Sequence, residues 1–279
     1  MSQLLPIGLS PCPNDTFMIH ALASGAVELP GFTVSPWLAD IEALNERAIA
    51  GRDPLPVTKL SVHGFAHAMD RYRLLRAGAA LGRGCGPLIV ARTAVAVADL
   101  AGRRVAIPGR YTTAHLLLRL FAPPTVEVVP LRFEAIMPAV AAGEVDAGVI
   151  IHEGRFTYPG YGLVEVADLG TLWEAATGLP LPLGVLAIER TLAAPPAEAV
   201  EEALRASILA AQARPEASAD YVRRHAQEMD PEVCRQHIAL YVNAYSLALG
   251  EEGEAAIAEL LARGAAAGIL PRRAAQRGA

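Results

Sequence analysis

The feature of the sequence that most constrains its fold is a change of pattern near residue 190. Before this point short apolar runs alternate with helix-like segments, whereas the periodic segments after it all have helical spacing. Alternation of strands and helices is typical of parallel sheets with helices on both faces. We therefore expect an α/β protein whose C-terminal third is helical.

The expected elements follow from apolar periodicity and from the positions of glycine and proline. Short apolar runs predict strands at residues 4–9, 33–37, 57–60, 72–76, 88–91, 104–107, 126–129, 147–151, 163–166 and 184–188. Helical spacing predicts helices at residues 16–24, 41–50, 61–70, 112–121, 133–142 and 171–177. In the C-terminal third, Val200, Leu204 and Ile208 recur at helical spacing. Further helices are expected after Asp230 and over residues 254–263.

Two segments rich in glycine and proline interrupt the alternating pattern, at residues 82–87 and 179–184. If the chain crosses between two lobes at both, residues 92–182 form a small inserted domain, and residues 1–91 and 183–279 form a large discontinuous one. Two doubly wound domains joined by two crossing strands, with a cleft between them, are the plan of type II periplasmic binding proteins. From the pattern alone, one doubly wound domain is an equal alternative.

Composition and charge restrict the class of partner. Hydrophobic residues make up 53% of the 279 residues and charged residues 19%, so the chain can fill a substantial core. The net charge of −5, with Lys59 as the only lysine, gives no reason to expect a nucleic-acid partner. Neither a secretory signal nor an apolar stretch of roughly 20 residues is apparent, so we expect no membrane association. Cys12, Cys85 and Cys234 are far apart and odd in number, which favours a reducing cytoplasm over a disulfide framework.

Four polar segments each follow an expected strand and open a helix or loop, at residues 10–16, 59–61, 108–113 and 152–155. In open α/β sheets, ligands bind outside the carboxyl ends of the strands. A helix N-terminus at that edge offers free N–H groups and partial positive charge, which suit anions. Any one of the Ser, Thr or Asn side chains is better explained as a helix cap. Together they predict a small anionic or polyhydroxy ligand.

His152 is the strongest candidate for catalysis. It ends the apolar run 147–151, so the strand delivers an imidazole to the mouth of a sheet. Histidine moves protons near neutral pH, which makes it a natural general base. A structural histidine bonded to the backbone explains the position equally well. Adjacent side chains seldom point the same way, so we expect Glu153 to face water.

Other motifs are better explained by structure than by chemistry. His63 and His67 have the spacing of metal ligands on a helix, but no third ligand is suitably placed, and we interpret them as ordinary helix residues. The glycine-rich segment 82–86 precedes a strand instead of following one, which favours a hinge over a phosphate loop. Cys12 has no partner nearby in sequence, so we expect a packed thiol. No metal site is predicted.

Several long motifs, in order along nearly the whole chain, identify it as similar to the 1,4-dihydroxy-6-naphthoate synthase family. They are SPCPNDTF at 10–17, TKLS at 58–61, GRGCGPL at 82–88, PGRYTTA at 108–114, IIHEGRFTY at 150–158 and YVNAYS at 241–246. Cys85 stands where an aliphatic residue is common in the family, and Gly154 where a serine is common. Neither is a position to which the family assigns chemistry.

The resemblance implies a carbon–carbon lyase with the two-lobed fold, which converts cyclic dehypoxanthine futalosine to 1,4-dihydroxy-6-naphthoate on the futalosine route to menaquinone. It implies no metal and no organic cofactor. The family's base corresponds to His152, and its substrate contacts correspond to Lys59, Leu60, Ser61, Thr112, Thr113 and Ala114. The strand-end argument alone adds Asn14 and Thr16 to the candidate substrate contacts.

Two alternatives to the synthase stay open. A non-catalytic protein that binds a small anionic ligand would share the fold, although the missing export signal argues against an exported receptor. Chorismate dehydratase, a related enzyme of the same route, also shares the fold, but the opening SPCPND and the segment 151–153 favour the synthase. No feature of the sequence specifies an oligomeric state.

Overall fold

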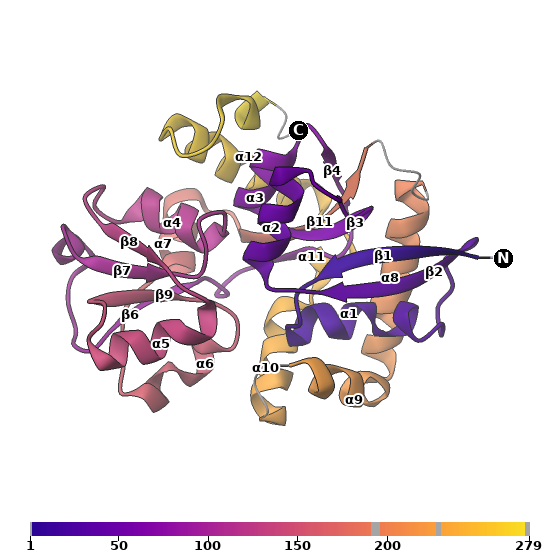
Figure 1. Cartoon of the computed structure of the whole chain (residues 1–279), viewed down its shortest axis with the longest axis horizontal. Helices are drawn as coiled ribbons and strands as arrows, with labels where there is room; N and C mark the ends of the chain where they lie inside the picture. Colours follow the sequence, from indigo (N-terminus) through magenta and orange to yellow (C-terminus); the bar gives the residue numbers. More distant parts are fainter. Residues whose placement is uncertain (1, 191–195, 227–229, 277–279) are drawn as a thin grey trace.

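Two β-sheets, each flanked by helices, divide the chain into two lobes in the computed structural model (Figure 1), which describes residues 2–190, 196–226 and 230–276. The large-lobe sheet comprises β1 (Gln3–Leu9), β2 (Phe32–Leu38), β3 (Val57–Ser61), β4 (Tyr72–Leu74), β5 (Ala80–Gly82) and β11 (Leu181–Glu189). The small-lobe sheet comprises β6 (Leu88–Ala91), β7 (Arg104–Ile107), β8 (Glu127–Pro130), β9 (Ala147–Ile150) and β10 (Val164–Asp168). The strand orders are β2-β1-β3-β11-β4, with β5 also paired to β11, and β10-β6-β9-β7-β8.

Helices cover both sheets on two sides, as the alternating pattern predicts (Figure 1). The large lobe carries α1 (Pro13–Ala23), α2 (Ile41–Ala50), α3 (Val62–Ala68), α8 (Ala197–Ala213), α9 (Pro215–His225), α10 (Pro231–Tyr241), α11 (Ala244–Leu247), α12 (Gly250–Ala266) and the 3₁₀ turn η3 (Arg272–Gln276). The small lobe carries η1 (Val97–Leu100), α4 (Thr113–Phe121), α5 (Phe133–Ala142), α6 (Gly154–Thr157), η2 (Tyr158–Tyr161) and α7 (Leu169–Thr177). None of these described helices is long and apolar enough to cross a lipid bilayer.

The expectation of parallel sheets is wrong for one strand in each lobe. β1 pairs in parallel with β2 and β3, and β7 pairs in parallel with β8 and β9. Among the described strands, β11 runs against β3, β4 and β5, and β6 runs against β9 and β10. Both reversed strands enter their sheet from the other lobe, so no strand–helix–strand crossover sets their direction.

The sheet pairings place the two lobe crossings at residues 83–87 and 178–180. The sequence analysis puts residues 88–91 in the large domain, but they form β6, which pairs with β9 and β10 of the small lobe. The glycine-rich break is itself the crossing, so the lobe boundary falls before β6. Here the chain passes close to α7, because a Cβ added to Gly86 would lie 2.2 Å from the backbone nitrogen of Gly170.

Apolar packing joins the lobes as well as filling each one. The largest core cluster includes Leu116 of α4 and Trp173 of α7 from the small lobe, with Leu181 of β11 and Leu260 of α12 from the large lobe. In the C-terminal third, Val200 and Leu204 of α8 are buried against the large-lobe sheet, as their helical spacing predicts. Burial of these side chains stabilises the contact between the two lobes.

We expect Gly86→Ala to lower the free energy of unfolding by about 1–3 kcal/mol, because the added methyl group would overlap the backbone of Gly170 and force the crossing away from α7. The measurement is urea unfolding followed by circular dichroism. Gly160→Ala is the matched control, since no atom lies within 4 Å of a Cβ at that position. If the two variants had equal free energies of unfolding, the crossing at residues 83–87 could move away from α7 without loss of stability.

Candidate active site

A pocket between the lobes gathers the polar residues that stand at the strand ends. The space between its walls, with the open mouth included, is about 640 Å³. Its walls include most of the residues that the sequence analysis selects, namely Asn14, Lys59, Ser61, Thr112, Thr113, Ala114 and His152. These come from the carboxyl ends of strands or the starts of helices in both lobes.

Two of the selected residues do not line this pocket. Leu60 is fully buried in the large core cluster, because neighbouring side chains along β3 point to opposite faces of the sheet. Thr16 is also fully buried, and its hydroxyl donates to the backbone oxygen of Cys12 at 3.0 Å. The described structure therefore gives Thr16 a local role in the first turn of α1 and Leu60 a role in the core.

A buried ion pair fixes the large-lobe wall of the pocket. The ammonium group of Lys59 donates to Asp15 Oδ1 at 2.8 Å and to the backbone oxygen of Gly78 at 3.0 Å. Asp15 also accepts from the hydroxyl of Ser10 at 2.8 Å and from the amide of Asn14 at 3.0 Å. The bond to Asp15 holds the start of α1 against β3, and the bond to Gly78 joins β3 to the segment between β4 and β5. A lysine has three N–H donors, so Lys59 keeps one for a ligand.

Two residues of α2 tie the lobes together beside the pocket. Asn45 accepts from the backbone N–H of Ser61 at 3.0 Å and donates to the backbone oxygen of Tyr111 at 3.2 Å. The carboxylate of Glu42 accepts from the N–H of Tyr111 at 2.9 Å, and burial raises its pKa. Gly109 allows this approach, because a Cβ there would lie 2.4 Å from the Glu42 carboxyl carbon.

Asn45 is not among the residues selected from the sequence, although its position in the sequence indicates a buried polar contact. The amide falls on the apolar face that Ile41, Leu44 and Ala48 predict for the helix at 41–50, and it is fully buried. A buried polar side chain requires hydrogen-bond partners. Its position therefore indicates a partner outside the helix, although the sequence does not say which one.

The start of α4 offers backbone donors to the pocket, and its threonine hydroxyls are already in use. Thr112 is the N-cap of α4, where its hydroxyl oxygen accepts from the N–H of His115 at 3.2 Å. The hydroxyl of Thr113 donates to the backbone oxygen of Leu183 at 2.7 Å. The N–H groups of Thr113 and Ala114 lie in the first turn and have no acceptor within the helix. They suit a carboxylate or an oxyanion.

His152 has a strained backbone and lies at the small-lobe edge of the pocket. Its φ of 55° is in the left-handed region, which costs a non-glycine residue about 1–3 kcal/mol and is concentrated at functional sites. The ring packs edge-on against Phe133, with 4.8 Å between ring centroids. The left-handed turn after β9 thus presents the imidazole to the cleft, and Phe133 restricts its rotation.

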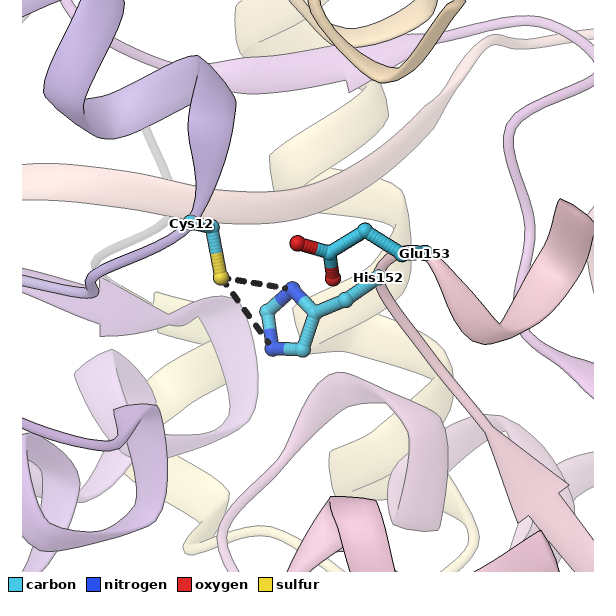
Figure 2. Close-up of side chains that lie close together, drawn as sticks. All are labelled: Cys12, His152 and Glu153. Atoms are coloured by element: carbon cyan, nitrogen blue, oxygen red, sulfur yellow. Dashed lines mark hydrogen bonds between the residues drawn. The ribbon is translucent and has the colours of Figure 1, made fainter. Parts of the chain in front are cut away.

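The structure adds a partner for Cys12 and overturns the expectation for Glu153. Cys12 is buried, as expected of a packed thiol, and its sulfur also lies 3.1 Å from Nδ1 and 3.7 Å from Nε2 of His152 across the cleft (Figure 2). Glu153, expected to face water, is only 5% exposed. The left-handed residue before it changes the direction of the chain, so alternation along a straight strand does not apply.

His237 of α10 is a further histidine in the pocket wall that the sequence analysis does not select. Its Nε2 lies 2.9 Å from Asn14 Oδ1. The Asn14 amide nitrogen faces the Asp15 carboxylate, so the amide oxygen must accept and His237 Nε2 carries the proton. Burial, and secondly the neighbouring His152, hold the pKa of His237 well below its usual value. His237 therefore stays neutral and orients Asn14.

His63 and His67 belong to an aromatic cluster at the junction of the lobes. His63 Nδ1 donates to the backbone oxygen of Thr112 at 3.1 Å, and its ring lies 5.4 Å from that of His67 and 5.9 Å from that of His115. Burial lowers the pKa of His63 to about 3. Each contact is structural, which agrees with the interpretation of this pair as helix residues.

Comparison with known proteins shows close relatives over almost the whole chain. Residues 5–266 match the model of a family described as menaquinone biosynthesis. A 1,4-dihydroxy-6-naphthoate synthase of Thermus thermophilus is 53% identical, covering 96% of each chain. One of the same name from Streptomyces coelicolor is 51% identical, covering 97% of this chain and 96% of the relative.

Solved structures show the same two-lobed arrangement. A structural-genomics protein from Archaeoglobus fulgidus superposes with a TM-score of 0.89 at 37% identity, covering 96% of this chain and 98% of its own. The periplasmic aliphatic sulphonate binding protein of Escherichia coli superposes with a TM-score of 0.65 at 16% identity, covering all of this chain and 92% of its own. The second likeness shows the fold alone. It confirms the two-lobed periplasmic-binding-protein-like fold.

We expect Lys59→Met to lower the free energy of unfolding by roughly 3–5 kcal/mol, because it leaves the carboxylate of Asp15 buried without its counter-charge. The double variant Asp15→Asn with Lys59→Met removes both charges and is expected to recover most of this loss. Urea unfolding at pH 7 measures both. A double variant no more stable than the single one would show that the loss comes from packing and not from charge.

The lowered pKa of His63 predicts a pH dependence of stability. Below the ordinary pKa of 6.5 the unfolded chain binds a proton that the folded chain does not bind until about pH 3. Stability is therefore complete above pH 6.5 and is lost as the pH falls, by up to about 1.4 kcal/mol per pH unit for this group. Urea unfolding of His63→Asn between pH 7 and pH 4.5 should show a shallower decline than wild type. If the free energy of unfolding declined equally steeply in the variant and in wild type, the lowered pKa of His63 would be contradicted.

Proposed function

This chain belongs to the menaquinone biosynthesis family, and we propose that it is a 1,4-dihydroxy-6-naphthoate synthase. In this proposal it is a carbon–carbon lyase that converts cyclic dehypoxanthine futalosine to 1,4-dihydroxy-6-naphthoate. Two relatives that cover nearly the full length and carry this name support it. The observation in the structure that carries it is His152, held in a strained left-handed conformation at the edge of a pocket lined by most of the expected substrate contacts.

His152 is the general base in the proposed reaction. It takes a proton from a hydroxyl or an acidic C–H of the substrate and so begins cleavage of the sugar-derived ring. Its ring contacts both Phe133 and the sulfur of Cys12, which limits the orientations it can adopt. A base fixed within hydrogen-bonding reach contributes about 10²–10⁴-fold to a rate. Formation of the aromatic naphthoate supplies the driving force.

In this proposal, groups from both lobes hold the substrate. The N–H groups of Thr113 and Ala114 receive its carboxylate or stabilise a developing oxyanion. The hydroxyl oxygen of Ser61 accepts from Asn45, which leaves its hydrogen to donate to a substrate oxygen. Lys59 contributes its remaining N–H. Thr112 acts indirectly in this proposal, because its side chain caps α4.

Contact between the lobes completes the site. Glu42 and Asn45 of the large lobe bind Tyr111 of the small lobe, so the start of α4 is held in place only when the lobes meet. Closure around a substrate excludes water and strengthens the polar contacts inside. We propose that the enzyme acts in the cytoplasm on a small molecule, without nucleic acid or membrane. None of the cysteines among the described residues forms a disulfide, which supports a reducing compartment.

We expect His152→Asn to lower kcat for conversion of cyclic dehypoxanthine futalosine by about 10²–10⁴-fold, because asparagine fills part of the space but cannot accept a proton. The assay follows the naphthoate by absorbance and mass. His20→Asn is the control, since His20 contacts Tyr221 on the far side of α1 and does not line the pocket.

The same assay separates the alternatives. If the His152→Asn variant turned over at the wild-type rate, His152 would not be the general base, but the proposed function would stand. Tight binding of the substrate without product, by wild-type protein, would identify a binding protein of the same fold. Formation of the dehydration product from chorismate would identify the related dehydratase.

A further inference from the structure

Three groups that bind transition metals converge across the cleft. Cys12 stands at the N-cap of α1 in the large lobe, whereas His152 and Glu153 follow β9 in the small lobe. One ligand atom from each lies within 4.8 Å of the other two. Figure 2 shows the sulfur of Cys12 and the carboxylate of Glu153 beside the imidazole of His152. The set forms only when the lobes meet, since Cys12 and His152 are 140 residues apart in sequence.

The chemistry of the three groups suits zinc better than a hard cation. Thiolate, imidazole and carboxylate are its ordinary ligands, at about 2.0–2.3 Å from the metal. Calcium and magnesium prefer oxygen ligands alone. Ligand atoms around a tetrahedral zinc ion stand roughly 3.3–3.8 Å apart. The distance of 3.1 Å between the sulfur and Nδ1 needs only a small adjustment to reach this range.

The local charges are also unbalanced in the way that a cation would correct. Glu153 Oε2 is buried and has no hydrogen-bond partner among the residues that the structure describes. An unpaired buried polar atom of this kind is costly and rare. Cys12 is buried beside it, and a second buried acid, Asp15, follows in the first turn of α1. The ammonium group of Lys59 cannot neutralise both acids, because it is bonded to Asp15.

We propose that Cys12, His152 and Glu153 form a Zn²⁺ site that spans the two lobes. Zinc displaces the proton of the Cys12 thiol, which leaves to solvent, and forms bonds to the sulfur, to one nitrogen of His152 and to a carboxylate oxygen of Glu153. Water occupies the fourth position. The ion supplies the counter-charge to Glu153 and holds the lobes in contact.

Zinc at this site inhibits the enzyme, and this consequence rests on the proposed function. An imidazole nitrogen bonded to a metal cannot accept a proton, so the base of the reaction is lost. Removal of the ion with a chelator restores turnover.

Metal binding is measured first, without any assay of turnover. Purified protein is titrated with Zn²⁺ against a chromophoric chelator, and with Co²⁺ to observe the near-ultraviolet charge-transfer band of a thiolate ligand. Wild type is expected to bind one ion per chain and to show the band. Cys12→Ser is expected to lose the band and at least 100-fold in zinc affinity, and Glu153→Gln to lose about 10–100-fold. Cys234→Ser, which removes a buried thiol outside the cluster, is the matched control and should bind as wild type does.

Turnover in the presence of zinc is measured second. Micromolar Zn²⁺ is expected to abolish naphthoate formation by wild type and to spare the residual turnover of Cys12→Ser, whose folding is checked by urea unfolding. Zinc binding that is equal in wild type and Cys12→Ser, or a cobalt complex without the thiolate band, would overturn the site. If zinc binds as described but no naphthoate forms under any condition, the site stands and the proposed function fails.

Discussion

The buried ion pair between Asp15 and Lys59 is the interaction on which the rest of the site depends. Removing two charges from water is costly, and the pair repays this cost only with further hydrogen bonds to both partners. Asp15 receives them from Ser10 and Asn14, and Lys59 donates to Gly78. The whole turn between β1 and α1 is thereby held against β3. Every pocket residue of that turn takes its position from this network.

The two lobes are coupled by a small number of specific contacts at the pocket. Glu42 and Asn45 bind the backbone of Tyr111, and Cys12 meets His152 from the opposite lobe. The periplasmic aliphatic sulphonate binding protein of Escherichia coli has the same two-lobed fold. In this chain the cleft contains a histidine with a strained backbone, His152, which we propose as the general base.

The structure changes which atoms of the expected site can act. The sequence selects the hydroxyls of Thr112 and Thr113, but both are engaged within the protein. At the start of α4, the donors left for a substrate are the first N–H groups. The structure also changes the surroundings of His152, because a thiol and a carboxylate oxygen without a hydrogen-bond partner among the described residues lie beside the proposed base. In the two proposals made above, proton transfer and metal binding compete for one imidazole.

The sequence by itself determines the local elements and the family. Apolar spacing gives the helices at 41–50 and 133–142 and the strands at 88–91 and 104–107 with the bounds that the structure has, because these patterns depend on residues a few positions apart. Long motifs in order identify the relatives, and the end of an apolar run places His152 at the mouth of a sheet.

Only the tertiary structure decides the direction of β6 and β11, the burial of Glu153 and the contact of Cys12 with His152. Each of these depends on segments that are distant in sequence and that meet when the lobes pack together. Local periodicity carries information about which face of an element is buried. It carries none about which distant side chain will lie opposite, because that is set by the packing of whole elements.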